Sequence, residues 1–369
     1  MLDRLDKSVA AISPLLGDLF EIAAVYRRDS HIVFSLAFRA DRERSLLLLK
    51  DRLKSAGYTF VTHVQGDILI LSVDPRPRLK IPRTNIILFV LTVFSVYFAA
   101  VFWRYNLVRP SGYAEDLASI VRETVQALLS GAGIEFTVAL MSILLVHEMG
   151  HFVASRRRNI VTSWPYFIPA PNLIGSFGAV IKSKSPFWNR RDLIEVGAAG
   201  PIAGWIVSIA WLLYGLSQSQ AVAPSSIMPG DIPFSLTGES ILMRLGSLLF
   251  MGPLPDGFSY RLTEAAFAGW VGLLVTAINL LPIGQLDGGH IVYGLLKNRQ
   301  QVLGRIAMVA LFALGFQSMM WWFFAAFGLL FGVTHPPTLD DSKHPGQAAT
   351  LMGIAALIIL FLSFTPAPF

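Results

Sequence analysis

Residues 134–155 read IEFTVALMSILLVHEMGHFVAS, an almost wholly apolar stretch that contains the pattern His147-Glu148-Met149-Gly150-His151. A helix needs about 20 apolar residues to cross the hydrocarbon core of a bilayer, so this stretch predicts a transmembrane helix. Because residues four positions apart share one face of a helix, His147 and His151 would point toward the same ion. The sequence therefore predicts a metal site inside a membrane.

The residue types at this site suit zinc. Two neutral imidazoles are typical zinc ligands, and a carboxylate such as Glu148 can take a proton from a water molecule beside the metal. Ionisable side chains are costly to bury in lipid, so in a transmembrane helix they usually mark a site or a pathway. A structural interpretation stays open: neighbouring helices could satisfy both histidines, with Glu148 bonded to a Ser or Thr.

The composition of the whole chain is typical of a membrane protein. Of its 369 residues, 54% are hydrophobic and only 15% are charged, which lies outside the usual range of soluble domains. The formal net charge of +6 could favour nucleic acid, but the Lys and Arg residues cluster beside apolar segments, as the positive-inside rule predicts. We therefore expect no nucleic-acid partner. The absence of cysteine excludes disulfides and Cys-ligated zinc.

Hydropathy divides the chain into a charged N-terminal part and an apolar remainder. The first part, residues 1–80, predicts a small soluble α+β domain with strands at 20–26, 32–38, 58–63 and 67–73 and a helix at 42–56. A basic, proline-containing linker follows. Candidate membrane spans then occur at 85–103, 134–155, 193–216, 263–281 and 347–365.

Two further segments do not fit single spans. Residues 301–333 are too long for one ordinary span, and we expect two short helices that turn near residues 316–318. The segment around residues 126–130 is expected to form an amphipathic helix at the membrane interface.

A catalytic zinc takes three protein ligands and keeps one position open, so a third ligand is needed. Asp287 is the best candidate. It follows an apolar span in the sequence NLLPIGQLDGGH, residues 279–290, where Pro282 and Gly284 end the helix. The expected topology brings Asp287 to the depth of the two histidines. Asp287 could instead cap the helix that follows it, and His290 is a further possible ligand.

The two segments together resemble the site-2 protease family of intramembrane zinc metalloproteases. Residues 147–151 look like the first motif of that family, and Leu286-Asp287-Gly288 looks like the second, with Asn279 eight residues ahead of the aspartate. The resemblance implies one zinc ion held by His147, His151 and Asp287. It also implies that Glu148 is the general base and then the general acid, and that Asn279 lies near the substrate carbonyl or the water. Asn279 could equally join two helices.

The region between the motifs resembles the same family. Gly175, Ser176, Phe177 and Gly178 are similar to its membrane-dipping β-hairpin, whose edge would pair with an extended substrate. The stretch GAAGPIAG at residues 197–204 is similar to the motif that opens the next core helix, and we interpret it as close helix packing.

Other features indicate a branch of the family. The segment at 165–180, the N-terminal domain and the loop at 335–341 look closest to the plant plastid and cyanobacterial branch named for ethylene-dependent gravitropism deficiency. The loop at 217–260 is too short for the PDZ domain that many bacterial relatives carry.

We therefore expect a polytopic α-helical membrane protein with about six to seven transmembrane helices, a membrane-dipping β-hairpin and a small N-terminal α+β soluble domain. The expected parts are the soluble domain at 1–80, a first transmembrane helix with its connecting segment at 81–133, a catalytic core resembling site-2 proteases at 134–300, and C-terminal transmembrane helices at 301–369.

The function that the resemblance implies is hydrolysis of peptide bonds in or near transmembrane helices of membrane-protein substrates, in contact with lipid. The substrate must unwind locally, because a helix hides its carbonyls in hydrogen bonds. Two other functions stay open. A metal transporter or sensor would also use intramembrane His and carboxylate side chains, although few acids lie within the spans. The second of these alternatives is a non-proteolytic protein that binds transmembrane segments.

The positions of the basic residues predict which side of the membrane each loop lies on. Basic clusters at 76–83, 156–158, 182–191 and 297–299 fall on one side of the expected topology, which the positive-inside rule makes cytoplasmic. The active site would then lie toward the cytoplasmic end of its helix. Since no transit-like leader precedes the first domain, we expect a prokaryotic plasma membrane, with a thylakoid or other plastid membrane as the alternative. The natural substrate and the oligomeric state do not follow from the sequence.

Overall fold

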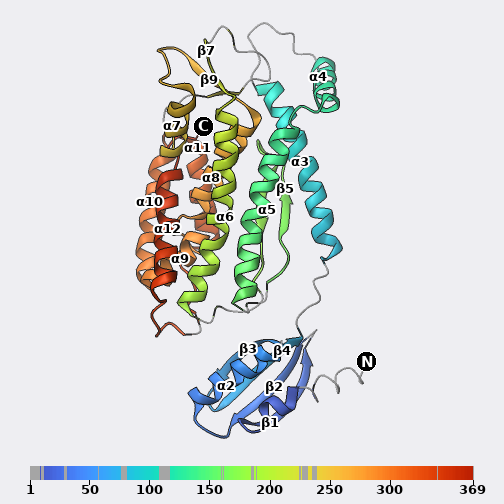
Figure 1. Cartoon of the computed structure of the whole chain (residues 1–369), viewed down its shortest axis with the longest axis vertical. Coiled ribbons are helices and arrows are strands. Elements are labelled where there is room, and N and C mark those ends of the chain that lie inside the picture. The colour runs from blue at the N-terminus through green and yellow to red at the C-terminus, as the bar shows by residue number, and fades with distance from the viewer. Residues whose placement is uncertain are drawn as a thin grey trace. The chain divides into compact units, whose positions relative to one another are not determined.

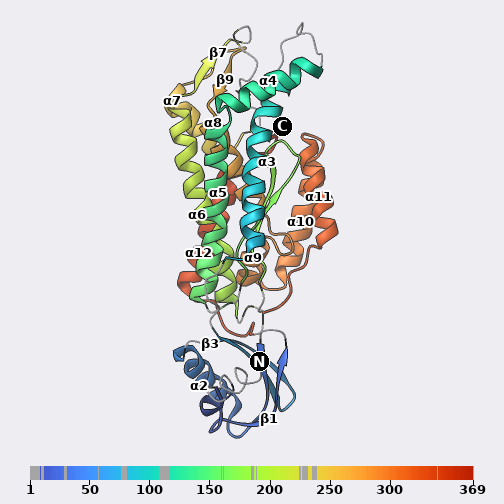
Figure 2. The same ribbon diagram turned by 90° about the vertical axis from the view of Figure 1, so that its right-hand side faces the viewer.

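The computed structural model describes residues 9, 12–28, 31–56, 58–75, 81–107, 117–158, 160, 162–183, 187, 189–223, 226, 232–234, 239–338 and 340–368. The chain divides into two compact units. The first comprises Met1–Ile81 with the short segments Arg156–Thr162 and Ser183–Pro186, and the second comprises the rest. Figures 1 and 2 show the two units in two orientations.

The first unit contains a four-stranded antiparallel sheet and a helix packed against it. The elements are β1 (Phe20–Arg28), β2 (His31–Phe38), α2 (Arg42–Ser55), β3 (Tyr58–Gln65) and β4 (Ile68–Pro75), with strand order β1-β2-β4-β3. Asp41 begins α2 by accepting a hydrogen bond from the Arg44 amide at 2.9 Å. Leu49 and Leu53 of α2 and Phe34 of β2 are fully buried. The strands and the helix predicted here are confirmed.

The second unit is a helical bundle. Its helices are α3 (Arg83–Leu107), α4 (Leu117–Ser130), α5 (Ile134–Arg157), α6 (Arg190–Leu216), α7 (Ile241–Met251), α8 (Glu264–Asn279), α9 (Asp287–Leu296), α10 (Arg299–Leu314), α11 (Met319–Phe331) and α12 (Gln347–Ser363). Its strands are β5 (Tyr166–Pro169), β6 (Ser176–Val180), β7 (Gln220–Val222), β8 (Ile232–Phe234) and β9 (Ser259–Leu262). In Figure 1, α5, α6 and α8 run along the same long direction.

Within the described residues, three helices are long and apolar enough to cross a membrane: Arg83–Phe102, Ile134–Arg157 and Arg190–Leu216. Shorter apolar helices accompany them at Ile241–Met251, Glu264–Asn279, Met319–Leu330 and Gln347–Ser363. The chain thus has the apolar helices of a membrane protein. The expected pair of helices within 301–333 is confirmed, because α10 and α11 are separate and Gly315–Ser318 lies between them.

The structure adds one feature to the prediction and extends another. The loop at 217–260 contains the 11-residue helix α7 and a three-stranded sheet of order β7-β9-β8. The amphipathic helix expected near 126–130 is longer, since α4 begins at Leu117, and it exposes an apolar stripe of Val121, Val125 and Leu129.

The centre of the bundle is the contact between α6 and α8, where glycine lets the two backbones approach. A Cβ atom on Gly269 would lie 2.4 Å from the Leu212 amide nitrogen. Trp270, beside it, is fully buried. The first residue of α8 also fixes the start of α5, because the Glu264 carboxylate accepts hydrogen bonds from the amides of Gly133 at 3.0 Å and Phe136 at 3.1 Å. The helix that carries His147 is thereby anchored to the helix that leads toward Asp287.

Candidate metal centre

His147 and His151 lie one turn apart on α5 and turn their rings toward the same point. Their Nε2 atoms are 3.2 Å apart. His147 is buried with 5% of its surface exposed, and the side chain of His151 is 12% exposed. The spacing of four residues on a helix explains why the two nitrogens converge.

Asp287 brings a carboxylate to the same point from another helix. Its Oδ2 lies 3.3 Å from Nε2 of His147 and 3.3 Å from Nε2 of His151. The capping alternative is not supported, since Leu286 is the N-cap residue of α9 and no side chain caps that helix. Asp287 is instead the first residue of α9, and its carboxylate faces the two histidines.

The three atoms form a triangle of the size that zinc requires. Ligand atoms about 2.0–2.1 Å from a tetrahedral zinc lie about 3.3–3.4 Å from one another. The observed separations are 3.2, 3.3 and 3.3 Å. The triangle can thus be one face of a tetrahedron whose fourth corner stays free. These residues fit a catalytic zinc ion in both ligand type and spacing.

The hydrogen bond on the far side of His151 selects the tautomer that metal binding needs. Nδ1 lies 2.7 Å from the carbonyl oxygen of Val196 on α6. A carbonyl can only accept, so Nδ1 must carry the proton and Nε2 is left with a free lone pair. Such an outer partner fixes both the ring orientation and the tautomer of a metal-binding histidine.

Glycines of α6 make room for both imidazoles. A Cβ atom on Gly200 would lie 2.1 Å from Nε2 of His151, and one on Gly204 would lie 3.0 Å from Nδ1 of His147. The stretch 197–204 was interpreted as general helix packing, so the sequence reasoning missed that it faces the metal centre. The signal was available in the spacing of Gly200 and Gly204, because residues four apart share a helix face.

Gly200→Ala is expected to displace the His151 ring and so to lower zinc affinity. Loss of a group that hydrogen-bonds to a metal ligand costs roughly tenfold to hundredfold in affinity, and we expect at least that loss here. The three atoms nearest to the added methyl group all belong to that ring. The measurement is competition for zinc with a chelator. Gly17→Ala serves as the control, since its methyl group would have room.

A double-mutant cycle, measured by thermal unfolding, shows whether the clash with His151 causes the loss of zinc affinity. Gly200→Ala should destabilise the wild type but not the His151→Ala variant, in which the clashing ring is gone. An equal loss of stability in both backgrounds would contradict the assignment.

Glu148 lies on α5 beside these candidate ligands. It is buried, with 6% of its surface exposed, and close enough to His147, His151 and Asp287 for electrostatic interaction. No other group of His, Cys, Asp and Glu that could hold a metal ion occurs among the described residues. Asn279 is outside that group; it is half-buried and ends α8, and the turn after it leads to Asp287.

Of the hairpin residues predicted from the sequence, Ser176, Phe177 and Gly178 lie on β6, which pairs antiparallel with β5, and Gly175 directly precedes it. Gly175 allows close contact with α3, since a Cβ atom there would lie 2.4 Å from the Ser95 carbonyl oxygen. The Ser176 hydroxyl accepts from the Gly178 amide at 2.9 Å and donates to the Ile168 carbonyl at 3.0 Å. Phe177 is 62% exposed. Gly175 and Ser176 thus hold the hairpin in shape.

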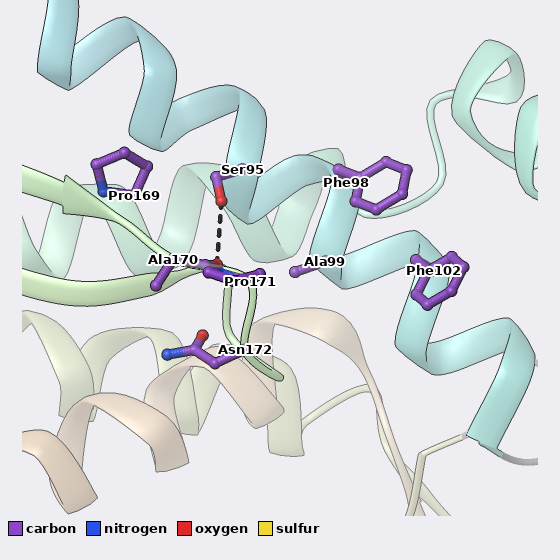
Figure 3. A pocket seen from close by; sticks show the side chains of 8 residues that line it. All are labelled: Ser95, Phe98, Ala99, Phe102, Pro169, Ala170, Pro171 and Asn172. Atoms are coloured by element: carbon purple, nitrogen blue, oxygen red, sulfur yellow. Dashed lines mark hydrogen bonds between the residues drawn. The ribbon is translucent and has the colours of Figure 1, made fainter.

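A cavity of about 430 Å³ lies between α3 and the hairpin. Figure 3 shows its lining, in which Ser95 donates a hydrogen bond to the Ala170 carbonyl at 3.2 Å. The remaining lining residues are Phe98, Ala99, Phe102, Pro169, Pro171 and Asn172. α3 packs mainly on β5. In the described part of the chain β6 pairs with β5 alone, so its outer edge has no strand partner.

Comparison with known proteins identifies a family whose model covers this part of the chain. The model of peptidase family M50 matches residues 135–322, just over half of the chain, and this match includes both the histidine pair and Asp287. The chain belongs to peptidase family M50. The resemblance to site-2 proteases predicted from the two motifs is confirmed. No solved structure matches the chain.

Curated plant proteins are similar to this M50 chain. It is 31% identical over 243 residues to the probable zinc metalloprotease EGY2, chloroplastic, of Oryza sativa subsp. indica, covering 64% of this chain and 43% of that protein. It is 31% identical over 291 residues to the probable zinc metalloprotease EGY1, chloroplastic, of Arabidopsis thaliana, covering 76% and 52%. The chain thus spans about half, or less, of the length of these relatives.

Proposed function

We propose that this chain is a zinc-dependent intramembrane endopeptidase that hydrolyses peptide bonds in or near transmembrane helices of other membrane proteins. One observation carries the proposal: Nε2 of His147, Nε2 of His151 and Oδ2 of Asp287 meet at 3.2–3.3 Å inside an apolar bundle. The zinc metalloprotease names of the M50 relatives support it.

The proposed chemistry divides between the metal and Glu148. When bound, zinc supplies Lewis-acid polarisation of a peptide carbonyl and makes a water molecule more acidic. Glu148 takes a proton from the attacking water and then gives it to the nitrogen of the leaving amine. Its burial beside the three ligands supports this role. Asn279 is assigned to positioning the substrate carbonyl or the water, on the strength of its place eight residues before Asp287.

We assign substrate contact to the outer edge of β6. A substrate must present an unwound backbone, and an extended segment can pair with an unpartnered strand through main-chain hydrogen bonds. Gly178 lies on this strand, with φ at +86° and open space where a Cβ atom would be. Main-chain pairing would let the enzyme accept substrates of differing sequence.

The membrane arrangement is also a proposal. It comprises six to seven spans with the hairpin dipping into the membrane, the soluble domain at 1–80, the first helix and connector at 81–133, the catalytic core at 134–300 and the C-terminal helices at 301–369. The basic clusters support a metal centre toward the cytoplasmic side. A prokaryotic plasma membrane is our preferred setting, whereas the relatives carry chloroplastic names.

A metal transporter would need several sites at different depths. In the described residues a single group of possible ligands is found, which favours the protease.

The test of the proposed function is cleavage of a panel of single-span substrates by the purified chain in lipid vesicles. Bound zinc should be quantified on the same sample. We expect one zinc ion for each chain and cleavage within or beside the apolar segment of at least one substrate.

A further inference from the structure

The loop between α11 and α12, residues 332–346, carries polar side chains that point into the protein rather than toward solvent. His335 is 7% exposed and Thr338 is 9% exposed. Burying polar groups is unfavourable unless they are hydrogen-bonded. The ring of His335 contacts α9, its amide contacts Gln300 on α10, and Thr338 bonds within the loop. Through these contacts the loop reaches α9, which begins with Asp287, and the turn before it.

The contacts to α9 join two residues on one face of that helix. Nδ1 of His290 lies 2.7 Å from Nε2 of His335, so one ring donates to the other. One turn further on, the Tyr293 hydroxyl donates to Oδ2 of Asp341 at 2.5 Å. Asp341 is held in turn by the Thr338 hydroxyl at 2.5 Å. The loop is therefore hydrogen-bonded to the first two turns of α9.

The contacts to the preceding turn run through Gln300, which is fully buried. Its Nε2 donates to the carbonyls of Pro282 at 3.0 Å and Val333 at 2.9 Å. Its Oε1 accepts from the His335 amide at 3.1 Å. The Gly284 amide donates to the Val333 carbonyl at 3.1 Å. The loop is thus bound to both sides of Asp287.

The position of Asp287 depends on tertiary contacts, which include α6 as well as this loop, because its own helix is short. It is the first residue of a ten-residue helix, and that helix has no side-chain N-cap. Isolated helices of this length are marginal. The turn before it contains Pro282 and Gly284, which interrupt regular backbone bonding. A small shift of the first turn of α9 would move the carboxylate away from the histidines.

We propose that His335 is a positioning residue for the metal centre. Through its ring contact with His290 and its amide contact with Gln300, it holds the first turn of α9 where Oδ2 of Asp287 stays 3.3 Å from both zinc-ligand nitrogens. This inference rests on the proposed zinc function. Burial lowers the pKa of His335, which disfavours the charged form of the ring beside His290.

The test compares variants that differ in the ring contact alone. His335→Phe fills the space but removes the bond, and His335→Gln restores a polar atom near the position of Nε2. The main-chain bond to Gln300 is kept in both. His344→Ala, in the same loop but exposed, is the control. Zinc affinity is measured by chelator competition, and the coordination geometry by the visible spectrum of the cobalt-substituted protein.

We expect His335→Phe to weaken zinc binding about tenfold to hundredfold and to change the cobalt spectrum, as outer-partner losses do. His335→Gln should recover most of the affinity, and His344→Ala should match the wild type. If His335→Phe does not fold, Tyr293→Phe removes a single hydroxyl at the same interface and should weaken zinc binding about threefold to tenfold.

Two results would overturn the inference: wild-type zinc affinity in the variant that folds, or equal losses in His335→Phe and His335→Gln. Neither result would contradict the proposed function, provided that the wild type binds zinc and cleaves substrate. A wild type that holds no zinc would remove the proposed function and this inference together.

Discussion

Glu148→Gln is expected to lower the rate of peptide cleavage by about 10²–10⁴-fold while one zinc ion stays bound. Glutamine keeps the shape of the side chain but cannot take a proton from water. The three proposed ligands are unchanged, so metal binding should persist. The measurement is single-turnover cleavage of a transmembrane substrate, with zinc determined on the same preparation.

Glu135→Gln is the matched control for this prediction. It makes the same change on the same helix, twelve residues before His147 and hence roughly 18 Å away along the helix axis. It should retain wild-type cleavage. Cleavage by Glu148→Gln at the wild-type rate would remove Glu148 as the general base, and loss of zinc from that variant would make it a structural or ligating residue instead.

Asp287→Ala is expected to weaken zinc binding by more than the roughly tenfold to hundredfold typical of outer-partner losses, since it removes one of three direct ligands. The remaining nitrogens of His147 and His151 offer only one edge of the tetrahedron. Cleavage should fall with zinc occupancy. The measurement is a zinc-binding isotherm by chelator competition in detergent.

Asp256→Ala is the control for the ligand assignment, because Asp256 is an exposed carboxylate in the loop before β9. It should bind zinc as the wild type does. If Asp287→Ala also binds zinc as the wild type does, Asp287 is not a ligand, and a third donor would have to be sought elsewhere in the bundle.

The parts of the fold that the sequence predicted well are those set by local periodicity. Alternation along 20–38 and 58–73 places the four strands of the first unit, and the apolar run around His147 places α5. Periodicity was uninformative in the loop at 217–260, where α7 is only 11 residues long. Short apolar segments do not distinguish a helix from a strand.

At the metal centre, the sequence predicted which residues meet but not how they are held. The spacing of His147 and His151 implies convergence on one helix face, whereas the cap and ligand interpretations of Asp287 differ only in where its carboxylate points. The roles of Gly200 and His335 depend on contacts across 49 and 45 residues of sequence, to His151 and His290. No local rule relates such distant positions, so only the packed structure reveals them.

The most direct test of the central claim is zinc removal from the purified wild-type chain followed by stepwise return of the metal, with cleavage of one transmembrane substrate measured at each step. We predict that cleavage disappears with the metal and returns in proportion to occupancy, reaching its full rate at one zinc ion for each chain. Cleavage that continues unchanged after the zinc has been removed would contradict the account.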